Sequence, residues 1–98
     1  MRTREDILED LLGAKSKVAE FGIREMGLFG SYQRNEQTET SDIDILIDFV
    51  PQKETYDNFL AVYDVIEEIF KGQKVEIVTK NGLSPYIGSK ILNEVHYV

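Results

Sequence analysis

Residues 42–49, with the sequence DIDILIDF, constrain the fold more than any other part of the chain. Isoleucine stands at positions 43, 45 and 47, while aspartate stands at 42, 44 and 48. Because side chains of a β-strand point alternately to opposite faces, this pattern predicts a strand with one apolar face and one acidic face. A carboxylate removed from water is costly unless a cation meets it, so the acidic face raises the question of function.

Three stretches of the chain place apolar residues three or four positions apart, which indicates amphipathic helices. They cover residues 3–20, 55–71 and 83–93. Thr3 stands where the first helix would begin, and Ser84 followed by Pro85 stands at the start of the last. Serine and threonine favour this position because their hydroxyl oxygens accept a hydrogen bond from the first helical turn, and proline suits the next position.

Two shorter apolar segments, residues 23–30 and 74–78, predict further strands. The polar segment 32–41 lacks periodicity and predicts one helical turn followed by a loop. Helices that alternate with strands in this way predict an α/β (α+β) fold, in which a small mixed β-sheet is flanked by helices. We expect one domain over residues 1–98, since a chain of this length suffices for a single core.

The composition narrows the functions that such a fold can have. There is no cysteine, which excludes disulfides and thiolate metal sites and fits the cytoplasmic location that we predict. No apolar run is long enough to span a membrane and no secretory leader is recognisable, so we expect no membrane association. The formal net charge of −7 opposes direct binding to nucleic acid, but it suits a basic protein partner or a polyphosphate bridged by divalent cations.

The Gly30-Ser31 pair ends the strand predicted at residues 23–30 and leads into the helical turn. Backbone N–H groups at such a turn lack partners and, with the serine hydroxyl, can bind phosphate oxygens. Gly-Ser is common in ordinary turns, so the pair gains weight only from its neighbours. Arg34 follows shortly after, and we include it among the nucleotide-binding residues because its guanidinium suits phosphate, with an ordinary surface arginine as an equal alternative.

Acidic residues on two predicted strands complete a candidate site. Asp42 and Asp44 should point to one strand face roughly 7 Å apart, where their carboxylates can converge on one or two Mg²⁺ ions. Glu76 interrupts the apolar strand at residues 74–78 and can join them if the two strands are neighbours. Asp48 lies near the strand exit and is expected in solvent. Each acid alone fits a solvated strand face, but the three beside a Gly-Ser turn predict two-metal phosphoryl or nucleotidyl transfer.

The segment GSYQRNEQTETSDID, residues 30–44, has the form Gly-Ser, ten residues, Asp-x-Asp. It resembles the signature of the DNA polymerase β-type nucleotidyltransferase superfamily. Over essentially its whole length the chain is similar to the minimal nucleotidyltransferases (MNT), the antitoxin half of HEPN/MNT toxin–antitoxin pairs. Two positions depart from the family pattern, since Glu76 stands where aspartate is usual and Asn35 where glycine is often found.

The resemblance implies a nucleotidyltransferase-like fold and a defined chemistry. On this basis Asp42, Asp44 and Glu76 are the catalytic acids and the ligands of Mg²⁺, with two ions expected, and Glu76 helps to deprotonate the attacking hydroxyl. Gly30 and Ser31 hold the triphosphate of ATP, the nucleotide substrate. The implied reaction moves AMP from ATP to a tyrosine hydroxyl of a partner HEPN ribonuclease toxin, and so neutralises it within a hetero-oligomer.

Other functions fit parts of the sequence. A binding module that neutralises the toxin by complex formation, with little or no catalysis, suits the charge of −7 and the departure at Glu76. A transferase acting on a small molecule would need a substrate-binding domain, and a template-directed polymerase a basic groove, and we see neither. The Asp42→Asn/Asp44→Asn variant separates the first two functions, because only a binding module should still neutralise its partner.

Overall fold

The computed structural model describes residues 2–98, which form a four-stranded sheet with the strand order β3-β2-β1-β4. Strand β1 (Ile23–Phe29) runs antiparallel to β2 (Ile43–Phe49), which runs parallel to β3 (Val75–Thr79). The short β4 (His96–Tyr97) pairs antiparallel with β1 at the other edge. The sheet is therefore mixed, as predicted.

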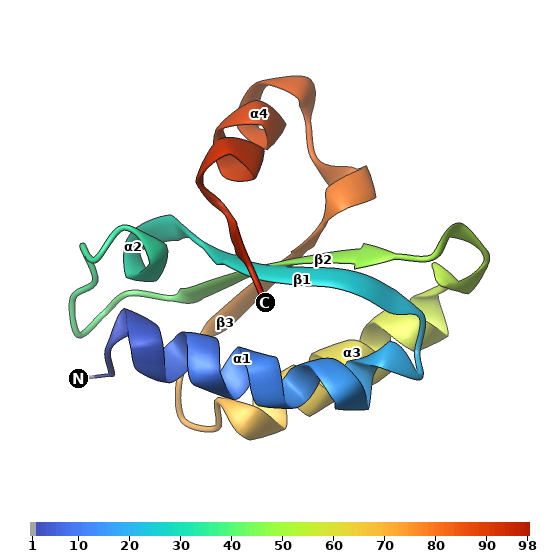
Figure 1. Ribbon diagram of the computed structural model, residues 1–98, viewed down its shortest axis with the longest axis horizontal. Coiled ribbons are helices and arrows are strands. Elements are labelled where there is room, and N and C mark those ends of the chain that lie inside the picture. Colours follow the sequence, from blue (N-terminus) through green and yellow to red (C-terminus); the bar gives the residue numbers. More distant parts are fainter. Residues whose placement is uncertain (1) are drawn as a thin grey trace.

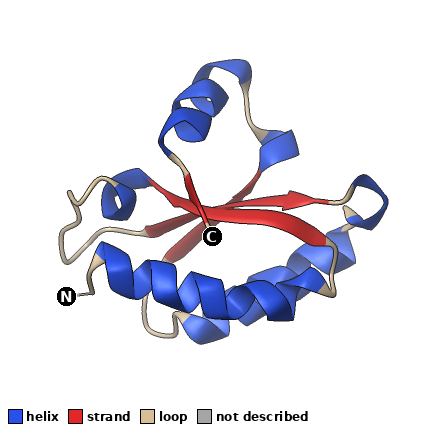
Figure 2. Cartoon of the chain, viewed as in Figure 1, coloured by secondary structure: helices blue, strands red, loops and turns tan. Residues whose placement is uncertain are grey.

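Helices lie on both faces of the sheet (Figures 1 and 2). Helices α1 (Arg4–Ala19) and α3 (Tyr56–Ile69) cover one face, while α4 (Pro85–Glu94) stands over the other. The single turn α2 (Gly30–Gln33) follows β1 directly, and two short 3₁₀ turns, η1 (Pro51–Lys53) and η2 (Lys80–Gly82), follow β2 and β3. Within residues 2–98, no helix is both long enough and apolar enough to cross a bilayer.

The face covered by α1 and α3 holds the main core. Ile43, Ile45 and Ile47 of β2 are fully buried there, which confirms the apolar face predicted for this strand. They pack against buried residues of the two helices and the segment after α3: Ile7, Leu11, Ala14, Val18, Val62, Ile66 and Phe70. Burial of each such aliphatic side chain stabilises the fold by about 1.5–3 kcal/mol, so this face supplies most of the stability.

The helix ends agree with the predicted caps. The Asp6 N–H donates to Thr3 Oγ1 at 3.1 Å, and the Thr3 N–H donates back to the Asp6 carboxylate at 3.0 Å, which forms a capping box at the start of α1. Ser84 Oγ accepts a hydrogen bond from the Ile87 N–H at 3.3 Å, and Pro85 is the first residue of α4. The structure thus confirms Thr3 and Ser84 as N-caps.

The opposite face of the sheet, toward α4, is only partly closed. Phe29, Leu46 and Ile91 form a small buried cluster there, with Val78, Leu83 and Val95 packed around it. Leu46 shares this face with the aspartates of β2, as the alternation predicted, because residues two apart on a strand point the same way. A few apolar contacts therefore hold α4 in place while leaving room beside the acidic residues.

The prediction that Asp48 lies in solvent is wrong. Its residue exposure is only 6%, and Arg24 Nε donates to its carboxylate at 2.8 Å. Arg24 belongs to β1, where the pairing with β2 shifts register between Ile23 and Glu25. The neighbouring strand thus supplies a guanidinium that covers this carboxylate, and such a cross-strand partner is not visible in the sequence of β2.

Candidate functional site

The parallel register of β2 and β3 places Asp44 directly beside Glu76. Both side chains line a hollow on the α4 face of the sheet, since the next pair along this face, Leu46 and Val78, packs in the cluster beneath α4. The condition on which Glu76 could join Asp44, that their two strands be neighbours, is therefore met. Strand pairing, and not sequence spacing, brings these two acids together.

Asp44 is electrostatically unusual for an aspartate. Its pKa is raised to about 6, chiefly by burial and then by the nearby negative charges of Glu76 and Asp42, while the Arg34 guanidinium acts in the opposite direction. When Asp44 and Glu76 are both ionised, the groups around them do not supply enough positive charge to balance their two negative charges. A divalent cation would supply that charge, and carboxylate oxygens are the ligands that Mg²⁺ prefers, so the donor set at Asp44 and Glu76 fits a magnesium ion.

Asp42 lies at the edge of this arrangement. Its side chain is one-third exposed, and its carboxylate lies 3.9 Å from the Lys74 ammonium, outside hydrogen-bonding distance. Across residues 2–98, no three or more acidic, histidine or cysteine side chains are arranged so that together they could hold a metal ion. Asp44 and Glu76 are thus brought together, whereas Asp42 contributes its charge to Asp44 from the side nearer Lys74.

Gly30 brings the backbone of α2 against Asp44. Its φ is +78°, a conformation that residues with a side chain rarely adopt, and a Cβ at this position would collide with the Asp44 carboxylate. Asn35, which ends the turn, also has a positive φ of 58°, in accord with asparagine's tolerance of that region. Gly30 therefore allows a backbone N–H group and a carboxylate to lie side by side.

The residues predicted to bind phosphate line a second hollow that adjoins Asp44. Gly30, Ser31 and Arg34 form one wall of it, and Lys90 and Glu94 of α4 form another, around a volume of about 330 Å³. The Gly30 N–H donates to Glu94 Oε2 at 2.5 Å, so its hydrogen-bonding capacity is taken by a side chain of the same chain.

Arg34 also binds Glu94. Its Nη1 donates to both carboxylate oxygens of Glu94, at 2.9 and 3.1 Å, and its Nε donates to Glu36 at 2.8 Å. These two carboxylates, with Glu36 the stronger, raise the Arg34 pKa. Sequence reasoning missed Glu94, although one signal was present: an acid at the C-terminal end of a helix opposes the helix dipole, which favours a cation nearby.

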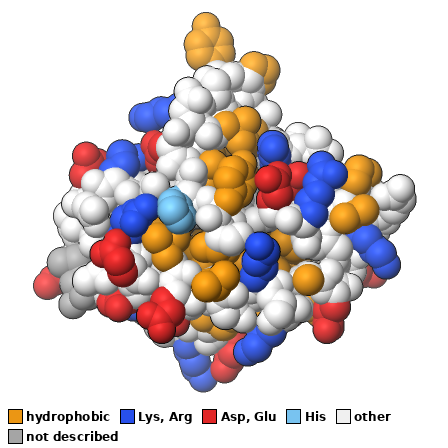
Figure 3. Space-filling view, viewed as in Figure 1, with side chains coloured by type: hydrophobic (Ala, Val, Ile, Leu, Met, Phe, Trp, Pro, Cys, Tyr) orange, Lys and Arg blue, Asp and Glu red, His pale blue; other side chains and the backbone are white. Residues whose placement is uncertain are grey.

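The larger hollow beneath α4 has one acidic and one apolar wall. Its volume is about 580 Å³; Asp44 and Glu76 stand on one side, and the rest of the lining includes the apolar residues Phe29, Val78, Leu83, Ile87 and Ile91. Figure 3 shows apolar side chains gathered over α4 and the region below it. A ligand with a flat apolar ring and an anionic, metal-bound end matches this combination of surfaces.

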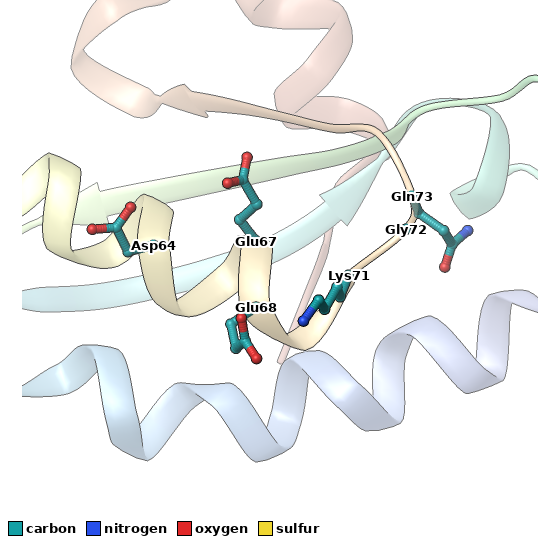
Figure 4. Close-up of a pocket in the computed structure, with 6 residues that line it drawn as sticks. All are labelled: Asp64, Glu67, Glu68, Lys71, Gly72 and Gln73. Carbon is teal, nitrogen blue, oxygen red and sulfur yellow. The ribbon is translucent and has the colours of Figure 1, made fainter.

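A hollow of similar size, about 570 Å³, lies at the end of α3, but it contains none of the predicted site residues. Figure 4 shows its acids pointing apart: Glu67 points toward the sheet, whereas Glu68 points toward α1, as does Lys71. These side chains do not converge on a common point. We therefore place the candidate site under α4, where Asp44 and Glu76 meet.

Comparisons with known proteins identify the family to which this chain belongs. A family model described as "Nucleotidyltransferase domain" matches residues 6–98. "Protein adenylyltransferase MntA" of Thermococcus cleftensis is 39% identical over 99 residues, which cover 100% of this chain and 98% of that protein. A protein of Methanocaldococcus jannaschii named "Putative protein adenylyltransferase" is 44% identical over 73 residues, or 74% of this chain and 76% of its own length.

Solved structures show the same architecture. One described as a "putative minimal nucleotidyltransferase" superposes with a TM-score of 0.82 and 27% identity, covering 97% of this chain and 95% of that chain. This chain therefore shares its fold with that protein over nearly the whole of both chains.

Proposed function

Since this chain belongs to the nucleotidyltransferase domain family, and to its minimal members, we propose that it transfers AMP from Mg-ATP to a tyrosine hydroxyl of a HEPN-type ribonuclease partner and thereby silences it. The observation that carries this proposal is the pairing of Asp44 with Glu76 between the Gly30 turn and the apolar hollow. Relatives named protein adenylyltransferase supply the choice of AMP as the group and a protein as the acceptor.

The two hollows would bind different parts of the nucleotide. The apolar wall of the larger hollow suits the adenine ring, while the smaller one, with Gly30, Ser31, Arg34 and Lys90, suits the triphosphate. Asp44 lines both hollows, which supports a position for it near the α-phosphate of the nucleotide. Asp42, Asp44 and Glu76 would hold magnesium, which would neutralise phosphate charge and orient the triphosphate for displacement.

The reaction is a displacement at the α-phosphorus of ATP. The acceptor tyrosine oxygen forms a bond to that phosphorus, the bond to the bridging oxygen breaks, and pyrophosphate leaves with its electron pair. Glu76, on the strand next to Asp44, would accept the proton from the tyrosine hydroxyl, and its pairing with Asp44 supports this role. The hollow is open to solvent, so the partner protein can bring its hydroxyl to it.

The alternative is a binding module that neutralises its partner by covering it. The net charge of −7 and the exposed apolar residues of α4, with Tyr86 93% and Ile87 62% exposed, favour a surface for a basic partner. On this alternative the acids of β2 and β3 act only through their charge.

Intact-mass spectrometry tests the two functions. A candidate HEPN-type partner protein is incubated with wild-type protein and Mg-ATP, in parallel with the Asp42→Asn/Asp44→Asn variant. An Asp64→Asn/Glu68→Gln variant serves as the matched control, because it also removes two negative charges, but from the hollow of Figure 4.

AMP transfer requires that the partner gain the mass of AMP with wild type and control but not with Asp42→Asn/Asp44→Asn. An unchanged partner mass with all three proteins, while a tight complex still forms, would overturn the transferase function and leave the binding module.

A further inference from the structure

We infer that Glu94 acts as an internal competitor of the nucleotide: its carboxylate occupies the place of a phosphate group between Gly30 and Arg34, and must leave when ATP binds. This inference rests on the proposed function, since it concerns how the same site is filled. In this role Glu94 sets the affinity for the nucleotide. It is not a catalytic residue, because its carboxylate must leave the site before the nucleotide can bind.

The contacts of Glu94 are those that a bound anion would make. One carboxylate oxygen accepts from the Gly30 N–H at 2.5 Å, and both accept from Arg34 Nη1, at 2.9 and 3.1 Å. The Glu94 side chain is only 18% exposed, so it is held inside the hollow and does not lie along its rim. A backbone N–H donor and a guanidinium that share one carboxylate would serve a phosphate oxygen equally well.

Occupation by Glu94 and by a triphosphate are mutually exclusive. The Gly30 N–H is a single donor with one close acceptor, and a Glu94 carboxylate beside phosphate oxygens would repel them. Asp44 adjoins the same hollow and adds negative charge to it. Binding of the triphosphate therefore requires that Glu94 turn away from Gly30. The apparent affinity is the intrinsic affinity multiplied by the fraction of molecules in which Glu94 has already turned away.

The contact is also suited to be displaced. An ion pair between partly exposed side chains is weak, and the Arg34 side chain is 41% exposed. A triphosphate carries more negative charge than one carboxylate and can engage Arg34 together with Lys90, which lies on α4 one turn before Glu94 and lines the same hollow. Glu94 thus keeps the site closed to weak anions without excluding a nucleotide.

Binding of Mg-ATP, measured by isothermal titration calorimetry, tests this inference with a matched pair of variants. Glu94→Gln keeps the size of the side chain and removes its charge at Gly30. Glu36→Gln removes the same charge from the other carboxylate on Arg34, which contacts Nε and does not touch Gly30.

Nuclear magnetic resonance follows the Gly30 amide proton in the same samples. Thermal melting confirms that each variant is folded, and Glu94→Ala serves as a second variant should Glu94→Gln melt early.

We expect Glu94→Gln to bind Mg-ATP roughly tenfold more tightly than wild type, because the competing carboxylate is gone, and Glu36→Gln to change affinity by less than about twofold. The Gly30 amide proton should shift on Glu94→Gln substitution, and in the wild type it should shift again when ATP is added. Equal or weaker ATP binding by Glu94→Gln would overturn the inference, because Glu94 would then support Arg34 without competing.

Failure of the inference and failure of the proposed function give different results. If wild type binds Mg-ATP and Asp42→Asn/Asp44→Asn does not, while Glu94→Gln leaves the affinity unchanged, the function stands and the competitor role is wrong. If neither wild type nor Glu94→Gln binds Mg-ATP, both are wrong, because removal of the competitor should have opened the site.

Discussion

The two faces of the sheet use the same strands for opposite purposes. Toward α1 and α3, Ile43, Ile45 and Ile47 of β2 are fully buried in a closed apolar core. Toward α4, the alternate residues include Asp44, whose pKa is raised to about 6 by burial and by neighbouring carboxylates. One face therefore gains stability from close packing, while the other keeps groups whose charges are incompletely balanced.

This contrast shows how 98 residues can hold both a core and a site. Because strand residues alternate between faces, Asp44 is held in place by the buried Ile43 and Ile45 on either side of it in the sequence. The closed face makes the strand rigid, and the parallel pairing with β3 then positions Glu76 with the same precision. A site built in this way needs few residues, because the core does the positioning.

The largest expected difference between the faces is in stability. Ile45→Ala should lower the free energy of unfolding by about 3 kcal/mol, because it removes buried methyl groups and leaves a cavity in the closed core. Urea denaturation at pH 7 measures this loss. Asp44→Asn, one residue earlier on the opposite face, should cause no loss; a comparable loss from both variants would show that the two faces contribute alike.

A smaller effect is expected at the contact between α2 and the acidic face. Gly30→Ala should cost about 2 kcal/mol of stability, because a side chain is strained at a φ of +78° and its Cβ would collide with Asp44. It should also abolish measurable Mg-ATP binding, because the Gly30 N–H would move away from Asp44. Thermal melting and calorimetry measure both effects, and a variant as stable as wild type would contradict them.

A still smaller effect, about 1 kcal/mol in the free energy of unfolding, should appear as a pH dependence that arises from the acidic face. Folding raises the pKa of Asp44 from 3.8 to about 6, so the protonated form is favoured in the folded protein. The stability from this group is fully present below about pH 4 and is lost as the pH rises through 6. Half-exposure of the side chain reduces the effect to the order of 1 kcal/mol.

Urea denaturation at pH 4 and pH 7 measures this contribution as the difference between wild type and Asp44→Asn. The variant should be the more stable of the two at pH 7, and the gap should narrow at pH 4. Mg²⁺ at millimolar concentration should stabilise wild type at pH 7 and leave Asp44→Asn nearly unchanged. A gap that does not depend on pH would contradict the assignment of this titration to Asp44.

The smallest expected effect is a gain in stability on the outer surface of α1. Gly13 is exposed within the helix, and a Cβ there would have no atom within 4 Å. Gly13→Ala should therefore stabilise the protein by about 0.5–1 kcal/mol through helix propensity, measured by thermal melting. It is also the matched control for Gly30→Ala, since a loss at both positions would mean that backbone conformation is not what distinguishes Gly30.

Local chemistry determined much of the fold. Alternation in residues 42–49 predicted both faces of β2, and the positions of Thr3 and Ser84 predicted two helix starts, because strand period and N-cap hydrogen bonds act over a few neighbouring residues. The same locality explains the failures. Asp48 is covered by Arg24 from another strand, and β4 packs against Gly27, where a Cβ would lie 2.7 Å from the His96 carbonyl oxygen.

The candidate site divides in the same way. The sequence by itself placed Asp42 and Asp44 on one strand face, and Gly30 at a turn, since these follow from spacing. Only the tertiary structure decided that Glu76 lies beside Asp44 and that Glu94 reaches Gly30 from 64 residues away. Strand order and helix docking depend on the free energy of the whole chain. The sequence of a single segment therefore does not determine which distant segment it contacts.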